Sequence, residues 1–227
     1  MNDPANFAPV ENLETLPGWF QLLAMVVNAG FGAAIARSRN VPVFGTILAG
    51  LLVGFGGGIF RDMMLGLEPV AISIWYYLPA GILGAAIGAL FFSKIVAMDT
   101  LGLVINGAVL GLLVTIGAQK ALDYDAPYVS AIFLGVITAS FGGLLADAMT
   151  GHRATVAKQA HWVGMALVFG TTIFVVISAG FKELMSPTIA FWIATVVAVI
   201  VTSFLRTRSQ KHNWNSVRWP GESLDAA

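Results

Sequence analysis

The most regular feature of this chain is the recurrence of long hydrophobic stretches without a charged residue. A helix needs about 20 predominantly apolar residues to cross a bilayer. Seven stretches come close to this length: Gly18–Ala36, Pro42–Phe60, Ile74–Ser93, Thr100–Gln119, Ala126–Ala146, His161–Gly180 and Leu184–Leu205. They are too long for barrel strands and lack the alternation of polar and apolar residues that such strands show. The pattern predicts an all-α integral membrane protein with seven transmembrane helices.

The composition supports this prediction. Hydrophobic residues make up 57% of the chain and charged residues 11%, with a mean hydropathy of +0.82. A soluble domain carries about 25% charged residues. The net charge is zero, so nothing indicates a nucleic-acid partner. The absence of cysteine excludes disulfides and thiolate chemistry. Acidic residues precede the first stretch without any Lys or Arg, unlike a secretory signal, so we expect this stretch to be retained.

The loops between the stretches differ in positive charge. One side carries most of the basic residues: Arg37, Arg39, Lys94, Arg153, Lys158, Arg206, Arg208, Lys211 and Arg218. The other side carries Lys120 and Lys182, with Arg61 just past the second stretch. Because basic loops stay in the cytoplasm, we expect a cytoplasmic C-terminus and an external N-terminus.

The second and fifth stretches resemble each other at a shift of 85 residues (127 minus 42). The matched pairs are Pro42 and Pro127, Gly50 and Gly135, Gly57 and Gly142, Gly58 and Gly143, Asp62 and Asp147, and Gly66 and Gly151. The first and fourth stretches align at a shift of 78, which pairs Asn28 with Asn106 (106 minus 28). We therefore expect one transmembrane domain, 1–227, with repeats at about 18–96 and 99–181, a seventh helix at about 184–206 and a tail at 207–227.

Three helices per repeat is an odd number, so the second repeat must enter the membrane from the opposite side. The expected fold is thus two inverted three-helix repeats plus one C-terminal helix. Inverted-repeat folds place their sites near the bilayer midplane, at broken helices.

The glycine runs of the repeat have two interpretations. Small residues let membrane helices pack closely, and Gly50, Gly54 and Gly58 have the four-residue spacing of such a contact. Three glycines in a row, however, cannot share one face. We therefore expect a kink or unwound turn at the glycine runs: Gly56, Gly57 and Gly58, and Gly142 and Gly143.

Charged residues follow each glycine run. Asp62 and Asp147 are expected toward opposite ends of one path, where acids would attract cations. Arg61 can pair with Asp62, whereas Ala146 takes the corresponding place beside Asp147, so we expect Asp147 to contribute more to cation selectivity. Lys120 directly follows the fourth stretch, where it either complements the helix dipole or moves as a charge in the membrane field.

Uncharged polar residues within the stretches are weaker candidates. Asn28 and Asn106 either join two helices by a hydrogen bond or line a polar path. Thr138 and Ser140 precede Gly142, but such hydroxyls often bond back to their own helix. No metal-ligand spacing, catalytic triad pattern or phosphate-binding loop is present, so we expect neither an enzyme nor a metal site.

Three motifs together resemble those of the trimeric intracellular cation (TRIC) channels, in particular the bacterial and archaeal members. They are Gly-Gly-Gly-x-x-Arg-Asp at Gly56–Asp62, Asp-x-x-Gly at Asp99–Gly102 and Gly-Ala-Gln-Lys-Ala-Leu at Gly117–Leu122. The resemblance extends over about Gly18 to Leu205. It implies a homotrimer in the prokaryotic inner membrane, with a potassium-conducting pore inside each protomer.

The resemblance also implies that the second and fifth helices kink at their glycines and line this pore. The family's second copy of the motif repeats the first, but here Phe141 and Ala146 replace its first glycine and its arginine. We expect no cofactor beyond permeant potassium or sodium ions and at most a bound lipid, and no partners besides the bilayer and further copies of the chain. Some bacterial proteins with this domain are regarded as glycine transporters, so a secondary transporter for a small zwitterion stays open.

Overall fold

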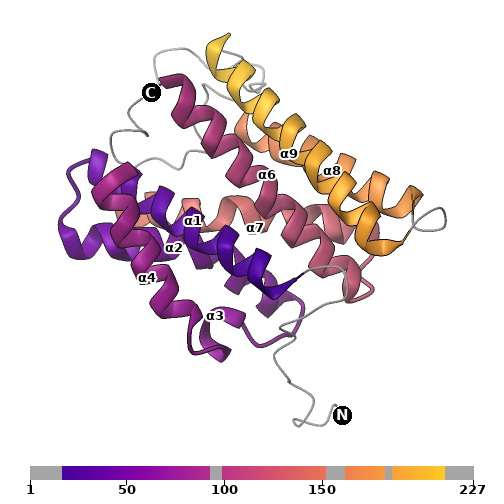
Figure 1. Ribbon diagram of the computed structural model, residues 1–227, viewed down its shortest axis with the longest axis horizontal. Coiled ribbons are helices and arrows are strands. Elements are labelled where there is room, and N and C mark those ends of the chain that lie inside the picture. Colours follow the sequence, from indigo (N-terminus) through magenta and orange to yellow (C-terminus); the bar gives the residue numbers. More distant parts are fainter. Residues whose placement is uncertain (1–16, 93–98, 152–161, 182–185, 213–227) are drawn as a thin grey trace, which may run out of the picture.

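The computed structural model describes residues 17–92, 99–151, 162–181 and 186–212, and these form a helical bundle (Figure 1). Its α-helices are α1 (Gly18–Ser38), α2 (Val43–Met64), α3 (Val70–Ser73), α4 (Tyr77–Ile87), α6 (Asp99–Asp123), α7 (Tyr128–Met149), α8 (Val163–Gly180) and α9 (Pro187–Lys211). A π-helix, η2 (Gly88–Phe92), continues α4. All of the regular structure in the described part is helical, as predicted.

Helices α2 and α7 pack against each other between the two halves of the bundle. On one side α2 packs against α1 and α4, and on the other α7 packs against α6 and α8. Helix α9 packs against α6 and α8 (Figure 1). The two segments that repeat in the sequence therefore meet at the centre of the fold.

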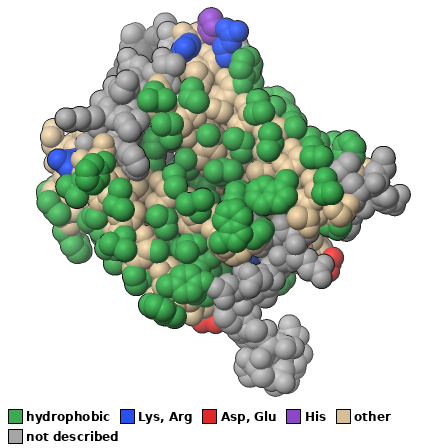
Figure 2. Space-filling view, in the orientation of Figure 1, with side chains coloured by type: hydrophobic (Ala, Val, Ile, Leu, Met, Phe, Trp, Pro, Cys, Tyr) green, Lys and Arg blue, Asp and Glu red, His purple; other side chains and the backbone are tan. Residues whose placement is uncertain are grey.

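Six of the described helices are long and apolar enough to cross a membrane, and α4 with η2 forms a shorter apolar helix. The space-filling view shows hydrophobic side chains over most of one face, with basic side chains near its edges (Figure 2). These findings match the predicted seven-helix membrane protein.

Three predicted boundaries differ from the structure. The third stretch is not one helix, because α3 ends at Ser73 and α4 begins at Tyr77. Helix α2 extends beyond Phe60 to Met64, so Arg61 and Asp62 lie inside the helix. Helix α9 continues to Lys211, so the predicted tail begins within a helix. Hydropathy marks the apolar core of a span, whereas polar residues can extend the helix beyond it.

The backbone repeats at the same 85-residue shift as the sequence. Helix α2 has 22 residues after Pro42, and α7 has 22 residues after Pro127. The left-handed residues Gly66 and Gly151 (both φ 70°) follow the two helices. Asn40 (φ 60°) and Asp125 (φ 55°) precede them, also 85 residues apart (125 minus 40). Left-handed backbone is uncommon outside glycine, so its recurrence at matched positions supports a structural repeat.

The glycines of α2 do not unwind it. Helix α2 is α-helical from Val43 to Met64, and the expected unwound turn at Gly56–Gly58 is absent. A methyl group added to Gly57 would collide with the backbone carbonyl of Thr138 in α7, and one added to Gly56 would lie 3.1 Å from the Cα atom of Gly142. Glycine costs a helix about 1 kcal/mol relative to alanine. The close backbone contact between α2 and α7 offsets this cost, as in other membrane helix pairs.

We expect Gly57→Ala to destabilise the protein, because its methyl group would press against backbone that cannot move without shifting a helix. Overpacking of this kind costs about 1–3 kcal/mol. The unfolding midpoint of the purified protein in detergent should fall by several degrees, at about 2–4 °C per kcal/mol. Gly143→Ala is the matched control, because no described atom lies within 4 Å of the added methyl group. Equal midpoints for the two variants would contradict the packing role of Gly57.

Candidate functional site

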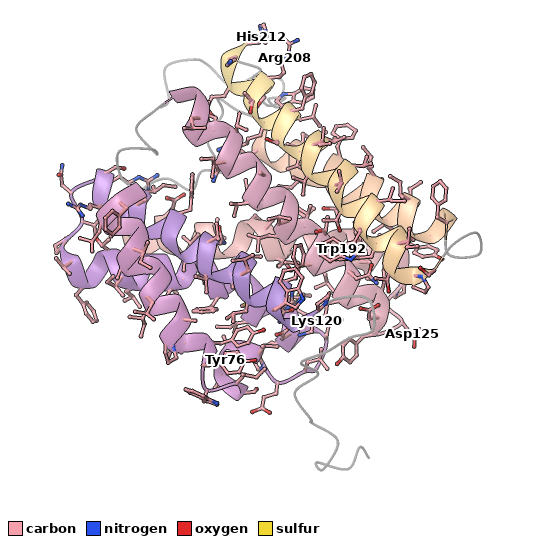
Figure 3. The ribbon with its side chains drawn as sticks, in the orientation of Figure 1. Tyr76, Lys120, Asp125, Trp192, Arg208 and His212 are labelled. Carbon is pink, nitrogen blue, oxygen red and sulfur yellow. The ribbon has the colours of Figure 1, made fainter. Side chains whose placement is uncertain are left out.

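A cavity of about 490 Å³ lies between the two halves of the bundle. We call it the inner cavity, because the loop residue Arg39 and the α9 residue Lys211 both come from the predicted cytoplasmic side. In the side-chain view, Arg208 and His212 mark this end of α9, while Lys120 and Asp125 lie toward the opposite side of the molecule (Figure 3). Its polar lining residues are Asn28, Arg39, Asn106, Ser140, Asp147, Thr150, Arg206, Gln210 and Lys211.

The two asparagines at matched repeat positions both line the inner cavity. The side-chain amide of Asn28 donates a hydrogen bond to the Val53 carbonyl of α2 (2.6 Å), and the Asn106 oxygen accepts one from Nε of Arg206 (3.4 Å). The interhelical bond and the polar lining, which the sequence left as alternatives, therefore occur together.

The two hydroxyl candidates bond back to their own helix. Thr138 donates to the Leu134 carbonyl and Ser140 donates to the Val136 carbonyl, both at 2.7 Å. Ser140 still lines the inner cavity. Thr138 is buried, and its backbone packs against Gly57 of α2.

The inner cavity ends where α2 and α7 touch. Gly142 packs on the backbone of α2, since a methyl group added there would lie 2.5 Å from the Leu52 oxygen and 2.7 Å from the Val53 oxygen. Gly143 instead lines the cavity and has open space beside it. Phe60 of α2 and Phe141 of α7 stack nearby, with ring centroids 4.1 Å apart. Adjacent glycines thus differ in role: one seals the helix contact and the next borders the cavity.

The predicted acid Asp147 is paired at the mouth of the inner cavity. Its carboxylate lies 2.7 Å from Nη1 of Arg39, in the loop between α1 and α2. The sequence showed Ala146 at the place beside Asp147 that Arg61 takes beside Asp62, so it offered no neighbouring base for this acid. The partner comes from a loop 108 residues away in sequence, which sequence spacing did not reveal.

Beyond the helix contact, at the other end of α2, lies a second charged group, which we call the outer cluster: Arg61, Asp62 and Lys120. Nη2 of Arg61 and Nζ of Lys120 lie 2.7 and 2.9 Å from Oδ1 of Asp62. All three side chains are at most 3% exposed. The pairing of Arg61 with Asp62 was predicted, whereas Lys120 was assigned only to the helix end or the membrane field.

The backbone around the outer cluster ties down the short helix α3. Oδ2 of Asp62 accepts a hydrogen bond from the backbone N–H of Val70, at the start of α3 (3.3 Å). Tyr77, which is fully buried, donates a hydrogen bond from its hydroxyl to the Gly18 carbonyl (3.2 Å).

Burial, with the charge of Asp62 adding to it, raises the pKa of Tyr124 just after α6, so this hydroxyl stays neutral near pH 7.

Two of the ion pairs join one repeat to the other. Arg39 precedes α2 and binds Asp147 near the end of α7, whereas Lys120 precedes α7 and binds Asp62 near the end of α2. Each repeat therefore supplies the base that holds the acid of the other. A basic residue shortly before each matched proline was the signal available in the sequence.

Comparisons with known proteins identify related membrane proteins and a shared fold. A family model described as "Glycine transporter" matches residues 18–93 and 98–179. The UPF0126 membrane protein of Deinococcus radiodurans is 25% identical over 130 residues, which are 57% of this chain and 60% of that protein, less than two thirds of its length. The UPF0126 inner membrane protein YadS of Escherichia coli K12 is 27% identical over 157 residues, 67% of this chain and 74% of that protein.

Solved structures share the fold. A chain from a study of conductance through TRIC cation channels superposes with a TM-score of 0.73 at 20% identity, covering 90% of this chain and 98% of that one. The TRIC orthologue from Rhodobacter sphaeroides gives a TM-score of 0.68 at 25% identity, covering 86% and 96%. The predicted fold and the resemblance to prokaryotic TRIC channels are confirmed.

Proposed function

Because this chain belongs to the glycine transporter family and shares its fold with TRIC cation channels, we propose that it is a passive cation channel. The observation that carries the proposal is the inner cavity, which lies between the two halves of the bundle and ends at the glycine contact of α2 and α7. We propose that each protomer of a homotrimer contains one such path and that potassium is its main permeant ion.

The proposed path leads through the inner cavity, past the contact of α2 with α7, to the outer cluster. In the present conformation the contact of Gly57 with the Thr138 backbone leaves no room even for an added methyl group, and we propose that it closes the path. Conduction therefore requires α2 and α7 to separate by a small distance. Glycines suit such a movement, because no side chains have to be unpacked.

The acids of this path have a second proposed role besides attracting cations. Asp62 and Asp147 both hold bases, so neither offers a free carboxylate to a cation in this conformation. We propose that the ion pairs of Lys120 with Asp62 and of Arg39 with Asp147 keep the two ends of the path closed. Separating Arg39 from Asp147 frees a carboxylate that then attracts cations, whereas Asp62 stays paired with Arg61 after Lys120 leaves it.

The surroundings of the proposed channel are a bacterial inner membrane and two further copies of the chain. The E. coli relative is described as an inner membrane protein, and the Rhodobacter structure is described as a trimeric channel. Large hydrophobic side chains such as Val43, Trp75 and Val129 are about four-fifths exposed on the single chain, and lipid or neighbouring copies would cover them.

A transporter for glycine or another small zwitterion is the second candidate, which the description of the matching family favours. The inner cavity offers both signs of charge that a zwitterion needs, in Arg206 and Asp147. The solved structures, however, are described as channels.

Recording from purified protein in a planar bilayer tests the proposal. A potassium gradient should produce discrete single-channel currents that reverse near the potassium equilibrium potential, and added glycine should leave them unchanged. Saturable glycine uptake into liposomes without such currents would instead establish the transporter and overturn the channel.

A further inference from the structure

Arg206 of α9 occupies an unusual position in the wall of the inner cavity. Its side chain is buried (7% exposed) and lines the cavity, and its Nε donates to Asn106. Its Nη1 is buried without a hydrogen-bond partner among the described residues. Arginine stays protonated in proteins, so this position carries a full positive charge.

No acidic side chain in the described parts of the chain forms an ion pair with Arg206. The acid that lines the inner cavity, Asp147, is already bound to Arg39. Lys211 adds a further positive charge to the lining. The described lining residues of the inner cavity therefore carry a net positive charge. A simple attraction of cations does not explain this charge in a proposed cation channel.

Ordinary roles of basic residues at a helix end do not explain Arg206 either. The basic residues in the last turn of α9, which complement the helix dipole, are Arg208 and Lys211. Arg208 is exposed and stacks over the ring of Phe204, as expected of a residue that marks the cytoplasmic side. Arg206 points inward instead, although burying an unpaired charge is costly.

The effect of a fixed charge on a passing ion depends on the valence of the ion. At roughly 8 Å through a water-like dielectric, one positive charge lowers the local concentration of a monovalent cation about 2.4-fold and that of a divalent cation about sixfold. A lower dielectric in the cavity enlarges both factors. An uncompensated charge therefore disfavours divalent ions relative to monovalent ones.

We propose that Arg206 is a specificity-determining residue, which makes the inner cavity select monovalent over divalent cations. This inference rests on the proposed channel function and names the residue that restricts its permeant ions. The charge of Arg206 slows all cations to some degree, and it excludes Mg²⁺ more strongly than K⁺.

The test compares permeability ratios for Mg²⁺ and K⁺, taken from reversal potentials with one ion on each side of a planar bilayer. In Arg206→Gln the ratio of Mg²⁺ to K⁺ permeability should rise at least about twofold. Arg206→Lys retains the charge and should keep the wild-type ratio. Arg208→Gln is the matched control, because it removes the same charge from the same helix outside the cavity. High ionic strength should shrink the difference between wild type and Arg206→Gln.

Asn106→Asp provides a second route if Arg206→Gln does not fold. It places a carboxylate beside Nε of Arg206 with almost no change in shape, so it neutralises the charge and leaves the guanidinium in place. It should raise the Mg²⁺ to K⁺ ratio as Arg206→Gln does. If the Mg²⁺ to K⁺ permeability ratio is unchanged in Asn106→Asp, or rises as much in Arg208→Gln as in Arg206→Gln, the proposed role of Arg206 is wrong. The proposed channel function would not be affected by either result. Absence of K⁺ current from the wild-type protein would overturn the proposed channel function and this inference with it.

Discussion

Replacing Asp62 by asparagine is expected to destabilise the protein more than any other single charge removal along the proposed path. The variant leaves Arg61 and Lys120 at most 3% exposed with no carboxylate between them. Removing one partner of a buried ion pair costs about 3–5 kcal/mol, because the remaining charge is neither solvated nor paired. At about 2–4 °C per kcal/mol, the unfolding midpoint in detergent should fall by about 10 °C.

The effect of Asp62→Asn is attributable to charge because the asparagine oxygen can still accept the hydrogen bond from Val70. Lys120→Gln is the matched control, since it leaves Arg61 and Asp62 as a balanced pair and should be tolerated much better. The double variant Asp62→Asn with Lys120→Gln should recover part of the lost stability, because one of the two repelling cations is gone. A wild-type midpoint in Asp62→Asn would show that the outer cluster does not hold α2 and α6 together.

The second large effect is expected from Gly143→Leu, which should abolish the current and leave the fold intact. Gly143 lines the inner cavity, and no described atom lies within 4 Å of a methyl group added there. The leucine side chain therefore enters the cavity instead of a packed contact. The obvious alternative, Gly57→Leu, would strike the Thr138 backbone and separate α2 from α7, so loss of current in it would not distinguish blockage from misfolding.

Gly180→Leu is the control for Gly143→Leu. It adds the same side chain at the end of α8, again with no described atom within 4 Å, and outside the inner cavity. Both variants should match the wild type in unfolding midpoint and oligomeric size on gel filtration. Single-channel recording should then show current in Gly180→Leu and none in Gly143→Leu. Wild-type conductance in a folded Gly143→Leu protein would place the ion path outside the inner cavity.

The repeat was readable in the sequence because it consists of residues with strong local preferences. Proline before each helix and glycine after it suit the local backbone geometry, and the structure has both in the same places. Asn28 and Asn106 were found by the same alignment, and both line the inner cavity. Features that follow from the local chain could therefore be predicted, together with the number of apolar spans, whereas the ends of several helices could not.

The partners of the charged residues could not be predicted in this way. Arg39 and Asp147 are 108 residues apart in sequence. Lys120 of α6 and Asp62 of α2 belong to different helices. Arg206 counted in the sequence only as one of many basic residues on the cytoplasmic side. Which of these charges is paired, and which faces a cavity unpaired, depends on how helices from both repeats are arranged around it.

The glycine runs show most clearly what the sequence determines and what only the tertiary structure determines. The sequence by itself indicated that α2 and α7 would be apolar helices, that they would form a related pair, and that each would contain small residues. Only the tertiary structure decided that Gly57 seals a backbone contact while Gly143 borders a cavity. The physical reason is that a glycine has no side chain of its own, so its role is set entirely by the atoms that the fold brings against it.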